Sequence, residues 1–214
     1  MPNWKIHLEI GNRLRDTLGY NDHDFNIFML GSILPDINSG FIVKDISQML
    51  NSGSTHFVDK EKGKMFLNFY NQYKDTIATQ PILVGYFLHL LVDYVWNQDF
   101  YKEYEAQDDV GLLYFKSLKD LKHNDFNKYN NKYISNTFII EDYEEAVELT
   151  KLVDRVSITT DDIKHVIDYL NSGKKDKFDR RKYVLFNEEH FDKLLDKSVS
   201  ICKRWLKKLN IILM

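Results

Sequence analysis

Apolar residues recur every three or four positions along most of the chain, a spacing that places them on one face of a helix. In residues 4–18 the pattern is carried by Ile6, Ile10 and Leu14, and Gly19 is suited to end that helix. The same spacing predicts further helices over residues 22–34, 59–74, 81–100, 111–133, 141–156, 160–170 and 188–209. The chain is therefore predicted to be all-α, with about seven or eight helices.

Turn-forming residues mark the expected breaks between these helices. Pro35 is expected to end the second helix, because the residue before a proline avoids the helical conformation. Residues 36–55 are rich in Ser, Asn and Gly, so they are predicted to form a long loop with one helical turn near residues 46–50. No internal repeat or low-complexity tract occurs, and we expect residues 1–214 to form a single compact domain, a multi-helix bundle around one core.

The composition supports a helical protein with a large core. Aromatic residues make up 14% of the 214 positions, which disfavours a disordered chain. Only 3 Pro and 9 Gly occur, too few turn residues for a many-stranded sandwich or barrel.

Charge and cysteine content narrow the function classes. The net charge of −3 offers no basic excess to neutralise a phosphate backbone, so no stable nucleic-acid partner is expected. The single cysteine, Cys202, excludes a disulfide within the chain and a multi-cysteine zinc site. Any metal must therefore be held by His, Asp and Glu. The oligomeric state is not determined by these features.

The N-terminal residues lack the apolar stretch of a signal peptide, and no run of 18 uncharged apolar residues predicts a transmembrane segment. We therefore expect a cytoplasmic protein. The most apolar stretch, residues 81–96, contains His89 and Asp93 in its middle. An imidazole and a carboxylate four residues apart project from the same face of a helix. This pair predicts either half of a divalent metal site or a buried His–Asp hydrogen bond that supports the core.

Three further residues favour the metal site. His7 lies among apolar residues of the first helix, Asp36 follows the helix-ending proline, and His56 lies at the end of the long loop. Taken alone, His7 can be a hydrogen-bonded core histidine, Asp36 a turn residue and His56 a surface-loop residue. Together with His89 and Asp93 they offer three imidazoles and two carboxylates from four segments. That set suits zinc best among common metals, with iron or manganese possible, and a carboxylate in it can be shared between two ions.

An ordered set of four short motifs resembles the bacterial zinc-dependent phospholipase C family, over about the first 100 residues. The motifs are Trp4-Lys5-Ile6-His7-Leu8, Gly31-Ser32-Ile33-Leu34-Pro35-Asp36, Thr55-His56-Phe57 and Gly85-Tyr86-Phe87-Leu88-His89-Leu90-Leu91-Val92-Asp93. The resemblance implies a compact all-α bundle related to that of the S1/P1-type nucleases.

The resemblance also implies roles for the five candidate residues. Asp36, His56, His89 and Asp93 match the ligands of one zinc ion, and Asp93 would bridge to a second ion that His7 helps to hold. Asp36 matches the carboxylate proposed as the general base. The implied function is hydrolysis of a phosphoester, with a small phosphoester or a phospholipid head group as substrate and metal-activated water as nucleophile.

The sequence departs from the family at two places. The metal-binding Trp of the secreted members is N-terminal, whereas Trp4 is not, and we expect it to pack at the site rim or in the core. Asp99 stands where the family has a histidine ligand of a third zinc ion. His123 and Asp125 do not match the family's remaining ligands of that ion, so either could serve only as a substitute ligand. We therefore expect one or two ions. A non-catalytic metal-binding member of the same fold remains an alternative.

Two other patterns offer alternatives. His23-Asp24 is the dipeptide of HD-type phosphohydrolases, with His7 and Asp93 as its possible partners, but its polar surroundings favour the start of a helix. The tail from Lys203 to the C-terminus is basic and amphipathic, and can contact an anionic membrane. A terminal helix docked on the core, with its lysines extended to solvent, is the interpretation that the sequence favours.

Overall fold

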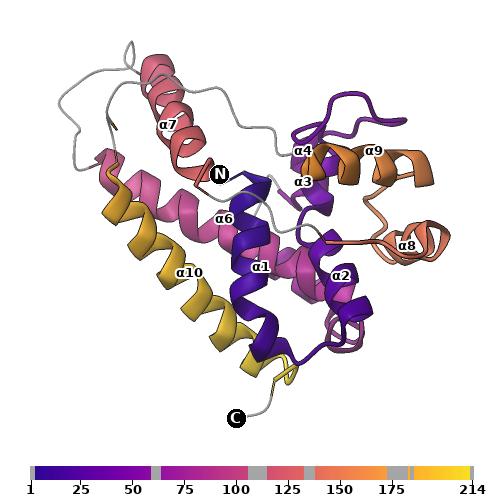
Figure 1. The fold of residues 1–214 in the computed structure, drawn as a ribbon. Helices are drawn as coiled ribbons and strands as arrows, with labels where there is room; N and C mark the ends of the chain where they lie inside the picture. Colours follow the sequence, from indigo (N-terminus) through magenta and orange to yellow (C-terminus); the bar gives the residue numbers. More distant parts are fainter. Residues whose placement is uncertain are drawn as a thin grey trace.

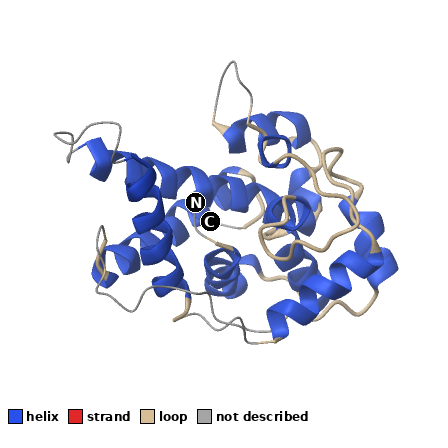
Figure 2. Ribbon diagram, turned by 90° about the horizontal axis from the view of Figure 1, so that it is seen from above, coloured by secondary structure: helices blue, strands red, loops and turns tan. Residues whose placement is uncertain are grey.

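The computed structural model describes residues 3–58, 64–105, 115–132, 138–172, 183 and 186–212, without the side chains of residues 101–105 and 115–122. These residues form ten α-helices and one 3-10 helix, and the described part contains no strand (Figure 2). The elements are α1 (Trp4–Leu18), α2 (Asp22–Gly31), α3 (Leu34–Asn38), α4 (Ser52–Thr55), α5 (Met65–Tyr73), η1 (Ile77–Thr79), α6 (Pro81–Glu105), α7 (Phe115–Asn130), α8 (Tyr143–Thr150), α9 (Thr160–Asn171) and α10 (Glu188–Lys208). The all-α prediction is confirmed.

Local signals in the sequence account for several helix ends. Gly19 ends α1 with φ +64°, a left-handed conformation that glycine adopts without strain, and its N–H bonds the carbonyl of Arg15. Thr159 begins α9 through a capping box, in which its side chain accepts from the backbone of Asp162 while the Asp162 carboxylate accepts from Thr159.

The segment after α2 differs from the prediction. Helix α2 already ends at Gly31, and Pro35 lies in the first turn of the short helix α3 instead of ending a longer helix. A proline fits there because the first helical N–H groups have no partner within the helix. The predicted loop contains α4 as well as α3, whereas the helical turn expected near residues 46–50 is absent.

Other predicted boundaries also shift. Helix α8 ends at Thr150, before the predicted limit at residue 156, and α6 extends beyond residue 100. The first residues of the helices predicted over 59–74 and 111–133 lie outside the described residues, as do residues 133–137. The described elements outnumber the predicted seven or eight helices because short helices such as α3, α4 and η1 carry too few residues to show a period.

Helix α6 forms the centre of the molecule, with α1 and α2 crossing in front of it and α10 running alongside (Figure 1). Its apolar residues from Ile82 to Trp96 are buried around the whole circumference, as expected for a helix that is covered on all sides. One hydrophobic cluster joins residues from α1 through α10. That the chain is a single domain stays a prediction. Among the described helices, none combines the length and hydropathy needed to cross a membrane.

Two glycines allow α2 and α6 to touch through their backbones. A Cβ atom on Gly85 would lie 2.1 Å from the carbonyl oxygen of Phe28, and one on Gly31 would lie 2.2 Å from that of Ile82. Only hydrogen fits at either position. This close crossing fixes the end of α2, and Ser32 directly after it, beside the N-terminal part of α6.

We expect Gly85→Ala to destabilise the protein by about 1–3 kcal/mol, because a methyl group would force two backbones apart. Gly11→Ala is the matched control, since its added Cβ would meet the flexible side chain of Met29 and not a backbone. Urea unfolding followed by circular dichroism measures both. Equal stabilities of the two variants would contradict the importance of the crossing.

Candidate metal centre

The structure brings all five predicted residues together. His7 comes from the second turn of α1, Asp36 from α3, His56 follows α4, and His89 and Asp93 share one face of α6. All five are buried, with 0–5% of each residue exposed. The five side chains therefore lie together as the motifs predicted. That they coordinate a metal stays a prediction.

Four side-chain atoms of this cluster converge, with five of their separations between 3.2 and 4.0 Å. The Nε2 atoms of His56 and His89 are 3.2 Å apart, and they lie 3.5 and 3.6 Å from Oδ2 of Asp93. Oδ1 of Asp36 is 3.6 Å from the His56 nitrogen and 4.0 Å from the His89 nitrogen. Ligands bound at 2.0–2.1 Å to a tetrahedral zinc ion lie about 3.3–3.4 Å from one another. The cluster therefore has the dimensions of a zinc site.

Backbone carbonyls orient the two imidazoles. Nδ1 of His89 lies 2.8 Å from the carbonyl oxygen of Ser32, and Nδ1 of His56 lies 2.9 Å from that of Ser52. A carbonyl oxygen only accepts, so each Nδ1 carries the proton and donates it. In the neutral rings both Nε2 atoms then present lone pairs to each other and to two carboxylates. Such a convergence of acceptors requires a cation between them, either a proton or a metal ion.

Asp93 connects these four atoms to His7. Its second oxygen, Oδ1, lies 3.4 Å from Nε2 of His7, whose ring stacks on that of His89 with centroids 3.8 Å apart. Within the described chain, both nitrogens of His7 and both oxygens of Asp93 are buried without a hydrogen-bond partner. An unsatisfied buried polar group costs about 1–3 kcal/mol. These atoms fit a second cation beside the first, with Asp93 facing both.

The pKa shifts in the metal-free cluster follow from burial and mutual charge. Burial and the neighbouring His7 lower the pKa of His89 to about 3, against the opposing effect of Asp93 and Asp36. Burial also opposes protonation of His56, but its contacts with Asp36 and Asp93 outweigh this and raise its pKa. For Asp93, burial raises the pKa, and the imidazoles of His89, His7 and His56 more than offset it, so the carboxyl stays ionised.

A strained turn holds His56 in place. The next residue, Phe57, has φ +54°, a left-handed conformation that costs a non-glycine residue of order 1–2 kcal/mol. Its fully buried ring packs edge-on against Phe69, Tyr73 and Tyr86, which compensates for this strain. The chain therefore reverses immediately after His56 and turns the imidazole inward.

Hydroxyl groups also support the cluster. Thr55 lies 3.1 Å from Nδ1 of His56 and 2.8 Å from the hydroxyl of Ser39, which donates to the carbonyl of Pro35. This chain links α3, which carries Asp36, to the end of α4. Sequence reasoning missed these residues and the carbonyls of Ser32 and Ser52. Their only signal was the density of small polar residues beside Asp36 and His56.

The residues considered for additional ligands lie elsewhere or have other partners. Asp99 pairs with His190 at 2.7 Å and with Lys197 at 3.2 Å, both from α10. Asp125 is buried and accepts from the backbone N–H of Phe186, while His123 is exposed. Trp4 is buried and packs edge-on against Tyr169, as expected for a core position.

The His23-Asp24 pair is not part of the cluster. His23 lies at the partly exposed start of α2, 3.5 Å from Glu145, and Asp24 accepts from the side chain of the capping residue Asn21. The clusters of the described chain that can hold a metal comprise His7 with Asp36 and His89, and His56 with His89 and Asp93. The arrangement of the HD-type alternative is therefore not observed.

Comparison with known proteins agrees with this geometry. The family model for zinc-dependent phospholipase C matches residues 6–155, well over half of the chain, and this stretch contains all five residues of the cluster. No curated protein and no solved structure matches the chain.

Purified protein is expected to contain about one or two equivalents of zinc, measured by elemental analysis. His89→Ala removes one of the four converging ligand atoms and should leave less than about half an equivalent of zinc. His23→Ala is the matched control and should keep the metal content of the parent protein. Loss of metal from His23→Ala with retention in His89→Ala would support the HD-type arrangement instead.

Zinc binding to the metal-free protein is expected to release a proton at pH values below the raised pKa of His56, because the metal must displace the proton that His56 then carries. Affinity should therefore fall by about tenfold for each pH unit below that pKa. Titration calorimetry in buffers of different ionisation enthalpy measures the proton count. A pH-independent affinity between pH 5 and 8 would contradict the assignment of His56 as a ligand.

Proposed function

Because the chain belongs to the zinc-dependent phospholipase C family, we propose that it is a metal-dependent hydrolase that cleaves a phosphoester. The single observation that carries this proposal is the convergence of four possible ligand atoms in a buried site, with five of their separations between 3.2 and 4.0 Å. A core that needed only a His–Asp hydrogen bond would not bury three imidazoles and two carboxylates together.

We assign Asp36, His56, His89 and Asp93 to one zinc ion, and His7 with the second oxygen of Asp93 to another. Zinc bound there would supply positive charge that lowers the pKa of water and neutralises a phosphate oxygen. The side chains keep that charge in place, because each imidazole is oriented through its Nδ1 and Asp93 faces both positions.

Asp36 is the residue we propose as the general base. It is the most exposed carboxylate of the cluster, with 6% of its side chain accessible against 1% for Asp93. Its Oδ1 faces the two imidazoles, which leaves Oδ2 to take the proton of the attacking water. Its position in the first turn of α3 also places its negative charge at the favourable end of a helix.

The surroundings of His56 favour an amphiphilic substrate. The ring of Phe41 lies 6.3 Å from that of His56, and 53% of Phe41 is exposed. Met49 and Val58, from the same segment of chain around α3 and α4, are also more than half exposed. Apolar side chains at the edge of a phosphoester site suit a phospholipid better than a small soluble phosphoester.

The alternative is a member of the family that binds metal without catalysis. It is favoured by the ion pair of Asp99 with His190 and Lys197, which occupies the position where a third zinc site is expected. The hydrolase and the non-catalytic alternative predict the same metal content, and they differ in whether the protein converts a substrate.

Wild-type protein is expected to hydrolyse a chromogenic phosphocholine ester or phosphodiester, and Asp36→Asn to lower kcat by about 10²–10⁴-fold, the usual contribution of a general base. Because asparagine keeps an oxygen ligand, zinc content should stay near that of the parent. Initial rates and elemental analysis on the same samples measure both quantities.

Asp99→Asn is the matched control, since it removes a carboxylate of α6 that pairs with His190 and Lys197 of α10, and its kcat should stay within about threefold of the parent. No turnover of a diester, a monoester or a phospholipid by the zinc-loaded parent would support the non-catalytic alternative. Full activity of Asp36→Asn would refute the role of Asp36.

A further inference from the structure

The C-terminal end of α10 carries a group of cations that the metal centre does not use. Its last turns present four exposed cationic side chains, Lys203, Arg204, Lys207 and Lys208. At 3.6 residues per turn the four positions fall within an arc of about 140° around the helix axis, so these charges form one broad surface. They lie beyond residue 155, where the family match ends.

These four cations have no acidic partner in the part of the chain that the structure describes. The contrast with the N-terminal half of α10 is clear, because there Glu188 pairs with Lys132, Glu189 with Lys193, and Asp196 with Arg13. A helix dipole explains one or two lysines near a C-terminus. It does not explain a local concentration of unpaired positive charge on a protein with a net charge of −3.

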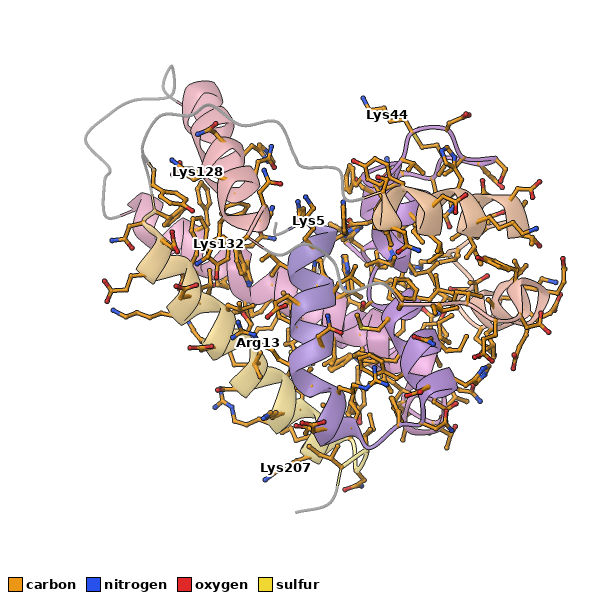
Figure 3. All side chains as sticks on the ribbon, in the orientation of Figure 1. Lys5, Arg13, Lys44, Lys128, Lys132 and Lys207 are labelled. Carbon is orange, nitrogen blue, oxygen red and sulfur yellow. The ribbon has the colours of Figure 1, made fainter. Side chains whose placement is uncertain are left out.

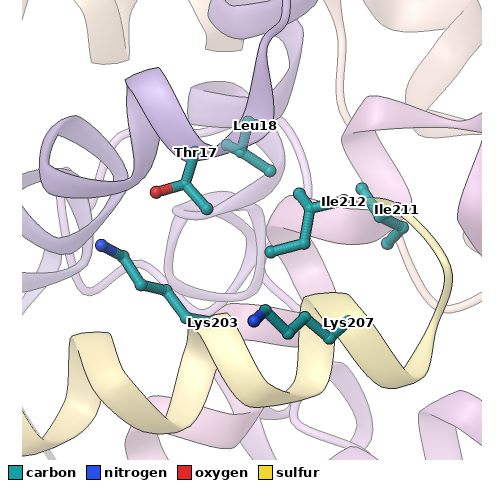
Figure 4. Close-up of a pocket in the computed structure, with 6 residues that line it drawn as sticks. All are labelled: Thr17, Leu18, Lys203, Lys207, Ile211 and Ile212. Atoms are coloured by element: carbon teal, nitrogen blue, oxygen red, sulfur yellow. The ribbon is translucent and has the colours of Figure 1, made fainter. Parts of the chain in front are cut away.

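Two of these lysines line a pocket between the C-terminal ends of α1 and α10 (Figure 4). The pocket has a volume of about 580 Å³, and Lys203 extends across it toward Thr17. The other lining residues are Leu18, Ile211 and Ile212. Asp16, which precedes Thr17, forms no ion pair with either lysine among the described residues. The pocket thus combines two ammonium groups and a hydroxyl with an apolar wall.

The pocket is separate from the metal centre. His7 lies near the beginning of α1 and Thr17 near its end, ten residues later, which corresponds to about 15 Å along the helix axis. In Figure 3, Lys5 marks the beginning of α1, and Lys207 lies near the other end of that helix.

We propose that this end of the molecule docks on an anionic phospholipid membrane surface, with a lipid phosphate held between Lys203 and Lys207. Charge complementarity selects the anionic lipid. The partly exposed Ile211 and Ile212 supply apolar side chains for the interfacial region. Trp205, partly buried beneath Lys208, places an aromatic ring beside this surface.

Co-sedimentation with phosphatidylcholine vesicles, with and without phosphatidylglycerol, tests the proposal on the full chain. The parent protein is expected to bind only the vesicles that contain phosphatidylglycerol and to dissociate at high salt. Lys203→Gln/Lys207→Gln should weaken binding roughly 25-fold, at about fivefold for each lost cation. Circular dichroism checks that each variant is folded.

Lys193→Gln/Lys197→Gln is the matched control, because it removes two lysines at the same spacing on the same helix, both of which have carboxylate partners. Its binding should equal that of the parent. Equal losses in the two double variants, or no binding of the parent to anionic vesicles, would overturn the proposal. Displacement by inorganic phosphate, beyond that by chloride at equal ionic strength, would also overturn it and assign the pocket to a free anion.

This test does not depend on turnover or on metal content. An inactive protein that binds anionic vesicles would refute the proposed hydrolase and leave the docking surface standing. An active protein that does not bind anionic vesicles would support the hydrolase and refute the docking surface.

Discussion

The fully buried carboxylate of Asp93 is the constraint around which the site is organised. An ionised carboxylate without a compensating charge cannot be buried at acceptable cost, and here three imidazoles approach its two oxygens from different sides. Two of those imidazoles already donate their Nδ1 protons to the backbone. Their remaining lone pairs therefore point inward, and a cation completes the arrangement.

The packing of the bundle makes this convergence possible. The backbone contact at Gly31 and Gly85 brings the carbonyl of Ser32 to His89, one turn further along α6. On the other side, the strained conformation of Phe57 reverses the chain after His56, and its buried ring is held by aromatic neighbours. The site is thus supported by the tight crossing of two long helices and by two very short helices, α3 and α4.

Helix α1 connects the two functional regions proposed for this protein. Its first turns deliver His7 to a buried site of nitrogen and oxygen ligands, whereas its last turn meets the cationic end of α10. Chemistry at a phosphoester needs a site from which water is largely excluded, so that electrostatic interactions are strong. Contact with a charged surface needs exposed, solvated cations. The length of one helix separates these two environments.

The sequence by itself determined the helical class, the long amphipathic helices and the pairing of His89 with Asp93, because these depend on residues only a few positions apart. The order of the motifs also predicted that His7, Asp36 and His56 would join them. Only the tertiary structure decided that their ligand atoms lie about 3–4 Å apart, that Ser32 and Ser52 orient the imidazoles, and that Asp99 pairs with His190 instead. These features depend on contacts between distant segments, and no local periodicity encodes them. The short helices α3 and α4 escaped prediction for the same reason, since tertiary packing and, for α4, the Asn51 cap stabilise them more than any periodic pattern of their own.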